Sequence, residues 1–230
     1  MRRMSRRVWM ATTVAGLYTI LTGSTTRGSS TSSQKDEEKE HPVTPAEDLM
    51  FEHGVLERLL LIYAETIRRI ESGGQFPVKL LSDTAGLFRR FGEDYHEKLE
   101  EQHIFPVLEK KNQHAELARE LKTQHDAGRK ITTSLIEMTK GGTLAQPQQA
   151  AQALASFYRM YIPHISRENS VAFRAFHEIV PQEQYQDLGE QFEAKERELF
   201  GEDGFQRVVE QVTVIEKDLG IDNIAKVTPR

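Results

Sequence analysis

The chain has 230 residues, of which 38% are hydrophobic and 28% are charged, and it contains no cysteine. This composition can bury a core, and the lack of cysteine excludes disulfide scaffolds, thiolate zinc sites, cysteine nucleophiles and iron–sulfur clusters. The net charge of -5 conceals an asymmetry, because residues 1–34 hold five of the 30 basic residues and no acidic one. The rest has 25 basic against 35 acidic residues. Such an acidic body argues against nucleic acid and anionic membranes as partners.

The N-terminal residues have the order of an export signal. Paired arginines at Arg6-Arg7 precede an uncharged stretch that ends at Leu21, and small and hydroxylated residues follow. The pattern is similar to a twin-arginine signal and predicts export to a bacterial periplasm, with residues 1–27 as the signal. An uncleaved N-terminal membrane anchor is the alternative, although about 14 residues span only about 21 Å as a helix. The Ser-rich and then charged residues 28–43 are predicted to be a flexible linker.

The remaining sequence predicts helices. Thr44-Pro45-Ala46-Glu47 is a capping box that starts the first one, and Gly73-Gly74 ends it. Apolar residues at helical spacing predict three more, over about 76–109, 113–139 and 147–180. No segment alternates with period two, so we expect an all-α fold. Four long helices with short connections favour an antiparallel up-down-up-down four-helix bundle over residues 44–180. Two shorter predicted helices, 182–199 and 204–219, make residues 181–230 a C-terminal helical extension.

Each of the four long helices carries one histidine on its apolar face. These residues are His53, His96, His125 and His164. Counted from the helix ends, they fall in one layer of the bundle, within roughly 12 Å at 1.5 Å per residue. A single histidine on such a face is most often a hydrogen-bonded core residue, but four buried together would be costly without a purpose. Because imidazole is a preferred ligand of iron, zinc and copper, the layer predicts a metal site.

Two of these histidines have a glutamate one helical turn later, as His96…Glu100 and His164…Glu168. This spacing points both side chains to the same side of a helix. Four imidazoles and two carboxylates are more than the four ligands of a structural zinc site. Two metal ions bridged by carboxylates suit the count better, and the mixture of imidazole and carboxylate suits iron.

Four motifs in order resemble the hemerythrin-like, or HHE cation-binding, family over about residues 45–180. They are Glu52-His53-Gly54-Val55-Leu56, Tyr95-His96-Glu97-Lys98-Leu99-Glu100-Glu101, Gln124-His125-Asp126-Ala127-Gly128-Arg129 and Tyr161-Ile162-Pro163-His164 with Glu168. The resemblance implies a four-helix bundle with a non-haem, carboxylate-bridged centre of two iron ions. It makes the four histidines terminal ligands, and Glu100 and Glu168 the bridges. Further candidate ligands are His103, Glu57 and Glu101.

The third helix departs from the pattern of oxygen-carrying hemerythrins, which have two histidines one turn apart there. Leu121 stands four residues before His125. One iron therefore has at least one fewer imidazole and an extra open position. We expect a protein that binds O2 or a related small ligand, such as peroxide or nitric oxide, in sensing, carriage or detoxification. The alternatives are a di-iron oxidase, peroxidase or nitric-oxide-handling enzyme, and an iron-storage or structural metal-binding protein. We expect no stable membrane association after signal removal; the oligomeric state stays open.

Overall fold

A computed structural model describes residues 43–226, 228 and 229 of the protein. The predicted export signal and all but the last residue of the predicted linker lie outside the described residues. Every secondary-structure element of the described part is a helix, which confirms the expected all-α class. None of the helices in this part is both long and apolar enough to cross a membrane.

The first long helix is α2, Pro45–Glu71, and its start is the capping box seen in the sequence. The Thr44 hydroxyl accepts from the Glu47 N–H at 3.3 Å, and the Glu47 carboxylate accepts from the Thr44 N–H at 2.8 Å. Both bonds satisfy backbone donors that a helix start otherwise leaves unpaired. The chain then turns at Gly73, whose φ of 68° suits glycine. The predicted boundaries of this helix are confirmed.

The second helical rod runs without a break from residue 78 to residue 110, but it is not a uniform α-helix. It consists of α3 Val78–Leu87, the π-helix η1 Phe88–His96, α4 Glu97–Leu99, the π-helix η2 Glu100–Ile104 and α5 Phe105–Lys110. π-Helical turns are rare and occur frequently at functional sites. Here one of them ends at His96 and the next begins at Glu100, both of them predicted ligands.

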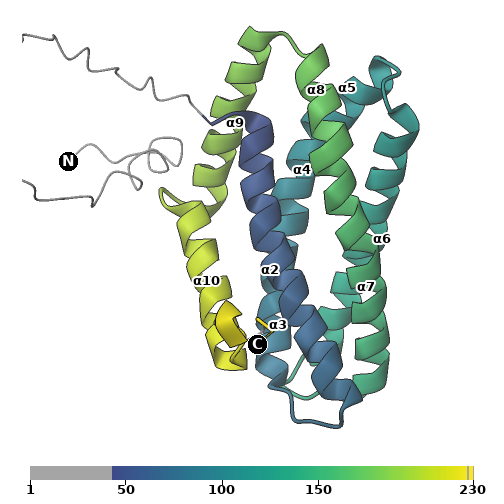
Figure 1. Ribbon diagram of the computed structural model, residues 1–230, viewed down its shortest axis with the longest axis vertical. Coiled ribbons are helices and arrows are strands. Elements are labelled where there is room, and N and C mark those ends of the chain that lie inside the picture. Colours follow the sequence, from purple (N-terminus) through teal and green to yellow (C-terminus); the bar gives the residue numbers. More distant parts are fainter. Residues whose placement is uncertain (1–42, 227, 230) are drawn as a thin grey trace, which may run out of the picture. The chain divides into compact units, whose positions relative to one another are not determined.

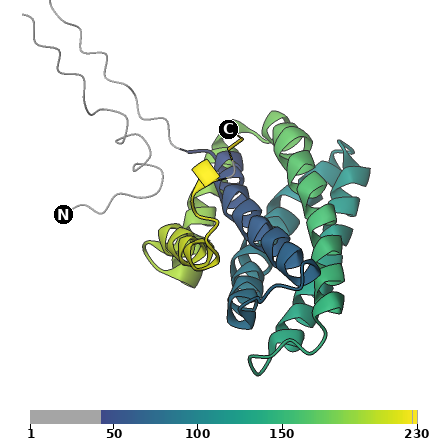
Figure 2. The ribbon, with the colours of Figure 1, turned by 60° about the horizontal axis from the view of Figure 1, so that its bottom comes forward.

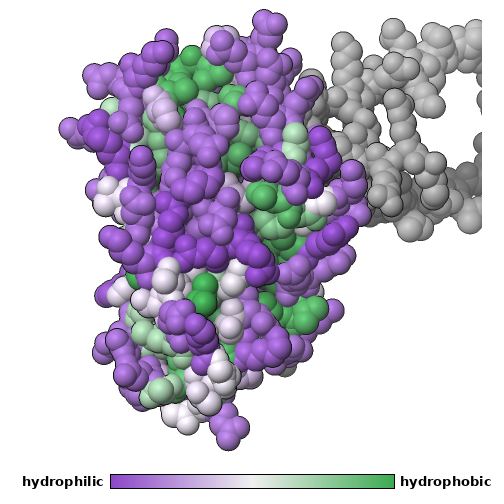
Figure 3. All heavy atoms as spheres, turned by 180° about the vertical axis from the view of Figure 1, so that it is seen from behind, coloured by the Kyte–Doolittle hydropathy of each residue, from purple (hydrophilic) through white to green (hydrophobic). Residues whose placement is uncertain are grey.

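The third and fourth rods complete the set that surrounds the core. The third is α6, Ala115–Thr139; the fourth comprises α7 Pro147–Arg167, η3 Glu168–Ala172, again π-helical, and α8 Phe173–Ile179. α7 packs along both α2 and α6, and α6 also packs against α3 and α5 (Figures 1 and 2). Buried aromatic rings fill the space between the rods: Phe88 and Phe157 contact each other, and each of them contacts both Tyr63 and Tyr161. Seen from behind, hydrophilic side chains cover much of the surface (Figure 3).

The C-terminal extension lies along the side of the bundle. It contains α9 Gln182–Phe200, α10 Gly204–Leu219 and the short 3₁₀ turn η4 Ile224–Lys226. α10 packs on α2 and α3, and α9 packs on α2 and η1 (Figure 1). Arg58 of α2 joins Glu216 of α10 through two hydrogen bonds, at 2.9 and 2.5 Å, and Thr213 through a third, at 2.8 Å. The extension therefore covers one flank of the second rod, next to the segment that carries His96.

Candidate metal centre

Six side chains, predicted as ligands and far apart in sequence, meet in the interior of the bundle. Each is at most 3% exposed. They come from four rods: His53 from α2, His96 from η1, Glu100 from η2, His125 from α6, His164 from α7 and Glu168 from η3. The histidine layer expected from helix counting is thus present in the structure, and the two glutamates lie within it.

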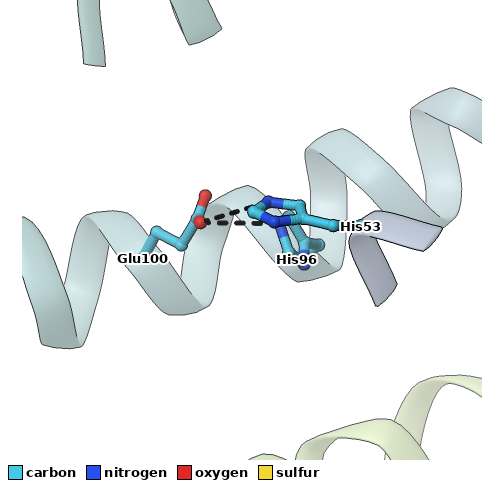
Figure 4. A group of neighbouring side chains, drawn as sticks. All are labelled: His53, His96 and Glu100. Atoms are coloured by element: carbon cyan, nitrogen blue, oxygen red, sulfur yellow. Dashed lines mark ion pairs between the residues drawn. The ribbon is translucent and has the colours of Figure 1, made fainter. Parts of the chain in front are cut away.

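The two carboxylates each face two pairs of imidazoles. Glu100 Oε1 lies 3.8 Å from His53 Nε2 and 3.5 Å from His96 Nε2 (Figure 4), and its Oε2 lies 3.4 Å from His125 Nε2. Glu168 is arranged in the same way from the opposite rod. Its Oε2 lies 3.3 Å from His53 Nε2, and its Oε1 lies 3.0 Å from His164 Nε2 and 3.8 Å from His125 Nε2.

These atoms divide into two donor sets, each with two imidazoles and a carboxylate. One set has His53, His96 and Glu100, and the other has His125, His164 and Glu168. Each carboxylate also approaches one imidazole of the other set, Glu100 that of His125 and Glu168 that of His53. Two donors that share a metal at about 2.0–2.2 Å stand about 3–3.5 Å apart. The observed separations are close to that spacing. His96 Nε2 and all four oxygens of Glu100 and Glu168 are buried without a hydrogen-bond partner among the described residues. Buried polar atoms rarely lack partners, so the arrangement fits two bound cations.

The outer nitrogen of every imidazole is held by a side-chain oxygen. His96 Nδ1 lies 2.8 Å from Glu52 Oε2, and His125 Nδ1 lies 3.2 Å from Glu101 Oε1. The other two bonds are His53 Nδ1 to Asn169 Oδ1 at 2.7 Å and His164 Nδ1 to Gln124 Oε1 at 2.9 Å. An imidazole that donates from Nδ1 to such an oxygen presents the lone pair of Nε2 to the interior. All four rings are therefore oriented as metal ligands.

The outer partners share one feature of position. Each of them directly adjoins one ligand in the sequence, and it bonds to a histidine that belongs to a different rod. Three of the four, Glu52, Gln124 and Asn169, were not predicted. Neighbouring residues point about 100° apart on a helix, so the side chain beside an inward ligand reaches the next rod. The signal available in the sequence was a polar residue directly beside four of the ligands, namely His53, Glu100, His125 and Glu168.

The electrostatic balance of the site favours positive charge. Although burial opposes it, the carboxylates of Glu100 and Glu52 raise the pKa of His96 well above its ordinary value. Burial also opposes the charge on His125, but Glu97, Glu101, Glu100 and Glu168 raise its pKa to about 9. The pKa of Glu168 is lowered, against burial, by His164 and His53. Protons thus compensate the carboxylates in the metal-free chain, and a cation in the same place does so too.

The three less certain candidates lie outside the two donor sets. Glu57 is exposed on α2. His103 is half-buried against α9, with its ring 5.4 Å from that of Phe192. Glu101 approaches His125 from the outer, Nδ1 side and also pairs with Lys98 and Arg129. Glu97, Glu101 and His125 form a further group that could hold a cation. The guanidinium of Arg129 already pairs with the carboxylates of Glu97 and Glu101.

Tyr161 connects this outer network to the ligands and depends on a glycine. Its hydroxyl donates to Glu97 Oε1 at 2.6 Å, and its ring lies 5.2 Å from that of His164. A Cβ atom built on Gly128 would lie 2.2 Å from the Tyr161 hydroxyl oxygen. Only glycine therefore leaves room for Tyr161 in this position.

We expect Gly128→Ala to lower the free energy of unfolding by about 1–3 kcal/mol, because the added methyl group must displace Tyr161. The matched control is Gly54→Ala on α2, where an added Cβ meets no atom within 4 Å and a stabilisation of about 0.5–1 kcal/mol is expected. Denaturant unfolding of both variants measures the difference. Equal stability of the two variants would show that Gly128 has no such packing role.

The chain is similar to proteins from two mycobacteria. Two curated relatives, one from Mycobacterium tuberculosis and one from Mycobacterium bovis, are each 44% identical over 195 residues, which is 84% of this chain and 76% of the relative. Both are named only as uncharacterized proteins. No solved structure matches the chain. The family model of the hemerythrin HHE cation-binding domain matches residues 44–176, which contain all six clustered side chains. The chain therefore belongs to the hemerythrin HHE cation-binding family, and its buried histidine and glutamate groups are able to hold metal ions.

Proposed function

We propose that the protein holds two non-haem iron ions and binds a small ligand, such as O2, peroxide or nitric oxide, at this centre. The observation that carries the proposal is the arrangement of Glu100 and Glu168, each of which turns its two oxygens to two different imidazole pairs. Carboxylates that face two ways are suited to bridging two metals. A donor set of nitrogen and oxygen without sulfur suits iron.

Two imidazoles and the shared carboxylates at each proposed metal position leave room for a further ligand. When bound, the iron pair supplies redox chemistry and open coordination positions. The protein residues orient and enclose the centre. Outer hydrogen bonds fix the orientation of the four imidazoles. Leu121, which is buried, lies one turn before His125, at the position where oxygen-carrying hemerythrins have a second histidine. The missing imidazole favours an exchangeable small ligand on the His125–His164 side.

A di-iron oxidase, peroxidase or nitric-oxide-handling enzyme is the second candidate, and the Tyr161 network favours it. The buried hydroxyl of Tyr161 contacts Glu97, which pairs with Arg129 at 2.7 Å, and the Arg129 side chain is 17% exposed. Glu97 Oε2 lies 4.0 Å from His125 Nδ1, and the Tyr161 ring lies 5.2 Å from that of His164. Turnover chemistry needs groups beside the centre that can accept and donate protons, as a carboxylate and a phenol can, whereas simple reversible binding does not.

Absorption spectra separate the two candidates. O2 or peroxide is added to the anaerobically reduced, iron-loaded protein, and the ligand is then removed under vacuum or by exchange. A stable spectral change that reverses on removal supports ligand binding, while repeated consumption of the ligand supports the enzyme. An unchanged spectrum with both O2 and peroxide would contradict both candidates.

We also propose an antiparallel order of the four rods and export of the protein to the periplasm. An antiparallel up-down-up-down order of the four rods is supported by the short connections between them, such as residues 72–77 and 111–114. Export to the periplasm is supported by the paired arginines and the apolar run near the N-terminus. A twin-arginine route moves folded proteins, which would allow the iron to be loaded before export.

A further inference from the structure

We propose that the C-terminal extension controls the position of His96, and through it the metal affinity of the His53–His96 side, by way of Phe200, Tyr95 and Glu52. These three act as positioning residues. The inference rests on the metal binding proposed above and gives the extension a role in it. It follows from one continuous set of contacts between α9 and the ligand.

Glu52 is the inner part of this path. Its carboxylate is 1% exposed and joins two groups of the second rod, the Nδ1 atom of His96 at 2.8 Å and the hydroxyl of Tyr95, which donates at 2.9 Å. The charge and direction of a buried carboxylate depend on its hydrogen bonds, since the surrounding protein screens weakly. The Tyr95 hydroxyl therefore helps to fix Glu52, and Glu52 fixes the ring of His96.

The extension holds Tyr95 from the other side. Phe200 is the last residue of α9, and its ring meets that of Tyr95 edge to face at 5.4 Å and that of Phe91 at 5.7 Å. Phe91 itself lies 5.7 Å from Tyr95. Edge-to-face contacts of this kind stabilise one orientation of each ring. The Tyr95 ring is thus enclosed between its own rod and the end of α9.

The corner between α9 and α10 keeps Phe200 in place. The chain turns at Gly201, with φ of 81°, and a Cβ atom on Gly204 would lie 2.6 Å from the Cβ atom of Phe200. Glu196 Oε1 accepts the N–H of Phe205 at 2.8 Å and so joins the last turn of α9 to the first of α10. Because this corner is closely packed, the position of the Phe200 ring depends on how α10 packs on α2.

Glu52 is a residue of the bundle, as are the outer partners of the other three imidazoles, but it is held by Tyr95, whose ring contacts the extension. The outer bonds of the other three go to Asn169 of η3, Glu101 of η2 and Gln124 of α6. A disturbance at Phe200 is therefore expected to reach one of the two metal positions first. This asymmetry distinguishes a positioning role from a general loss of stability, which would weaken both positions.

The test is a titration of the full chain with Co²⁺, in which the absorption bands of the bound Co²⁺ report binding. The wild type is compared with Tyr95→Phe, Phe200→Leu and the double variant. Tyr95→Phe keeps the ring and removes only the hydroxyl. We expect each single variant to weaken one of the two binding steps about tenfold and to leave the other unchanged, which is the usual size of an outer-partner effect. Because both variants act on the same bond to Glu52, the double variant should be little worse than either.

Phe192→Leu is the matched control, since Phe192 is a buried ring of the same helix that lies against His103. It should cost stability and leave both Co²⁺ affinities within about twofold of the wild type. Wild-type affinities in both Tyr95→Phe and Phe200→Leu would overturn the inference alone. Equal weakening of both steps, or the same effect from Phe192→Leu, would overturn it too. A wild-type chain that binds no Co²⁺ would instead overturn the proposed metal centre.

Discussion

Glu168→Gln is expected to reduce the iron bound after anaerobic reconstitution from about two ions per chain to less than about one, because the amide replaces a carboxylate shared by both donor sets. Glu100→Gln should act in the same way, since Glu100 also faces both imidazole pairs. His96→Ala and His164→Ala each remove a donor from one set only, so each should lower the iron content by about one ion per chain. Metal analysis after gel filtration measures all four variants.

Glu57→Gln is the control for these variants. Glu57 follows His53 by four residues, the spacing of the two proposed bridges, but its side chain is exposed. We expect it to keep the wild-type iron content. Full iron content in Glu168→Gln, or a loss in Glu57→Gln, would contradict the assignment of the bridges.

Acidification is the second change with a large expected effect, and it should weaken metal binding. The pKa of His125 is raised to about 9, so this ring carries a proton in the metal-free chain at neutral pH, and the pKa of His96 is shifted in the same direction. A metal must displace the proton of any ring that it binds through Nε2. Each displaced proton makes the apparent affinity fall about tenfold per pH unit below the raised pKa. Co²⁺ titrations between about pH 6 and pH 9 measure the slope.

The stability of the metal-free chain should depend on pH in the opposite direction. Because the folded-state pKa of His125 lies above its ordinary value of 6.5, its contribution to stability is full below that value and is lost as the pH rises through about 9. Metal affinity should therefore increase over the range in which metal-free stability declines. A metal affinity that is constant across this range would contradict the proton competition.

Much of the fold was predictable because its signals are local. The capping box at Thr44 and the glycines after residue 72 set the ends of α2, and the structure confirms them. The ligand layer could be predicted for a similar reason, since an i,i+4 spacing determines which side chains share a helix face. The one histidine on the apolar face of each long helix then indicates the height of the site along the bundle.

The remaining features depend on contacts between distant segments, which no local pattern encodes. Arg58 and Glu216 are 158 positions apart, and their ion pair docks the extension on a side of the bundle that the helical periodicity alone did not identify. His103 has the same spacing from Glu100 as a ferritin-like ligand pair, yet the packing of α9 places it against Phe192. The π-helical turns at His96, Glu100 and Glu168 were not predicted either, because the spacing of the apolar residues around them is also compatible with a continuous α-helix.

The central claim, that six buried side chains hold two iron ions, is tested most directly by the iron content of the wild-type chain. The full chain is reconstituted with Fe²⁺ under anaerobic conditions, freed of unbound metal by gel filtration, and analysed for metal and protein. Two donor sets predict about two iron ions per chain. Less than about one ion per chain would contradict the claim.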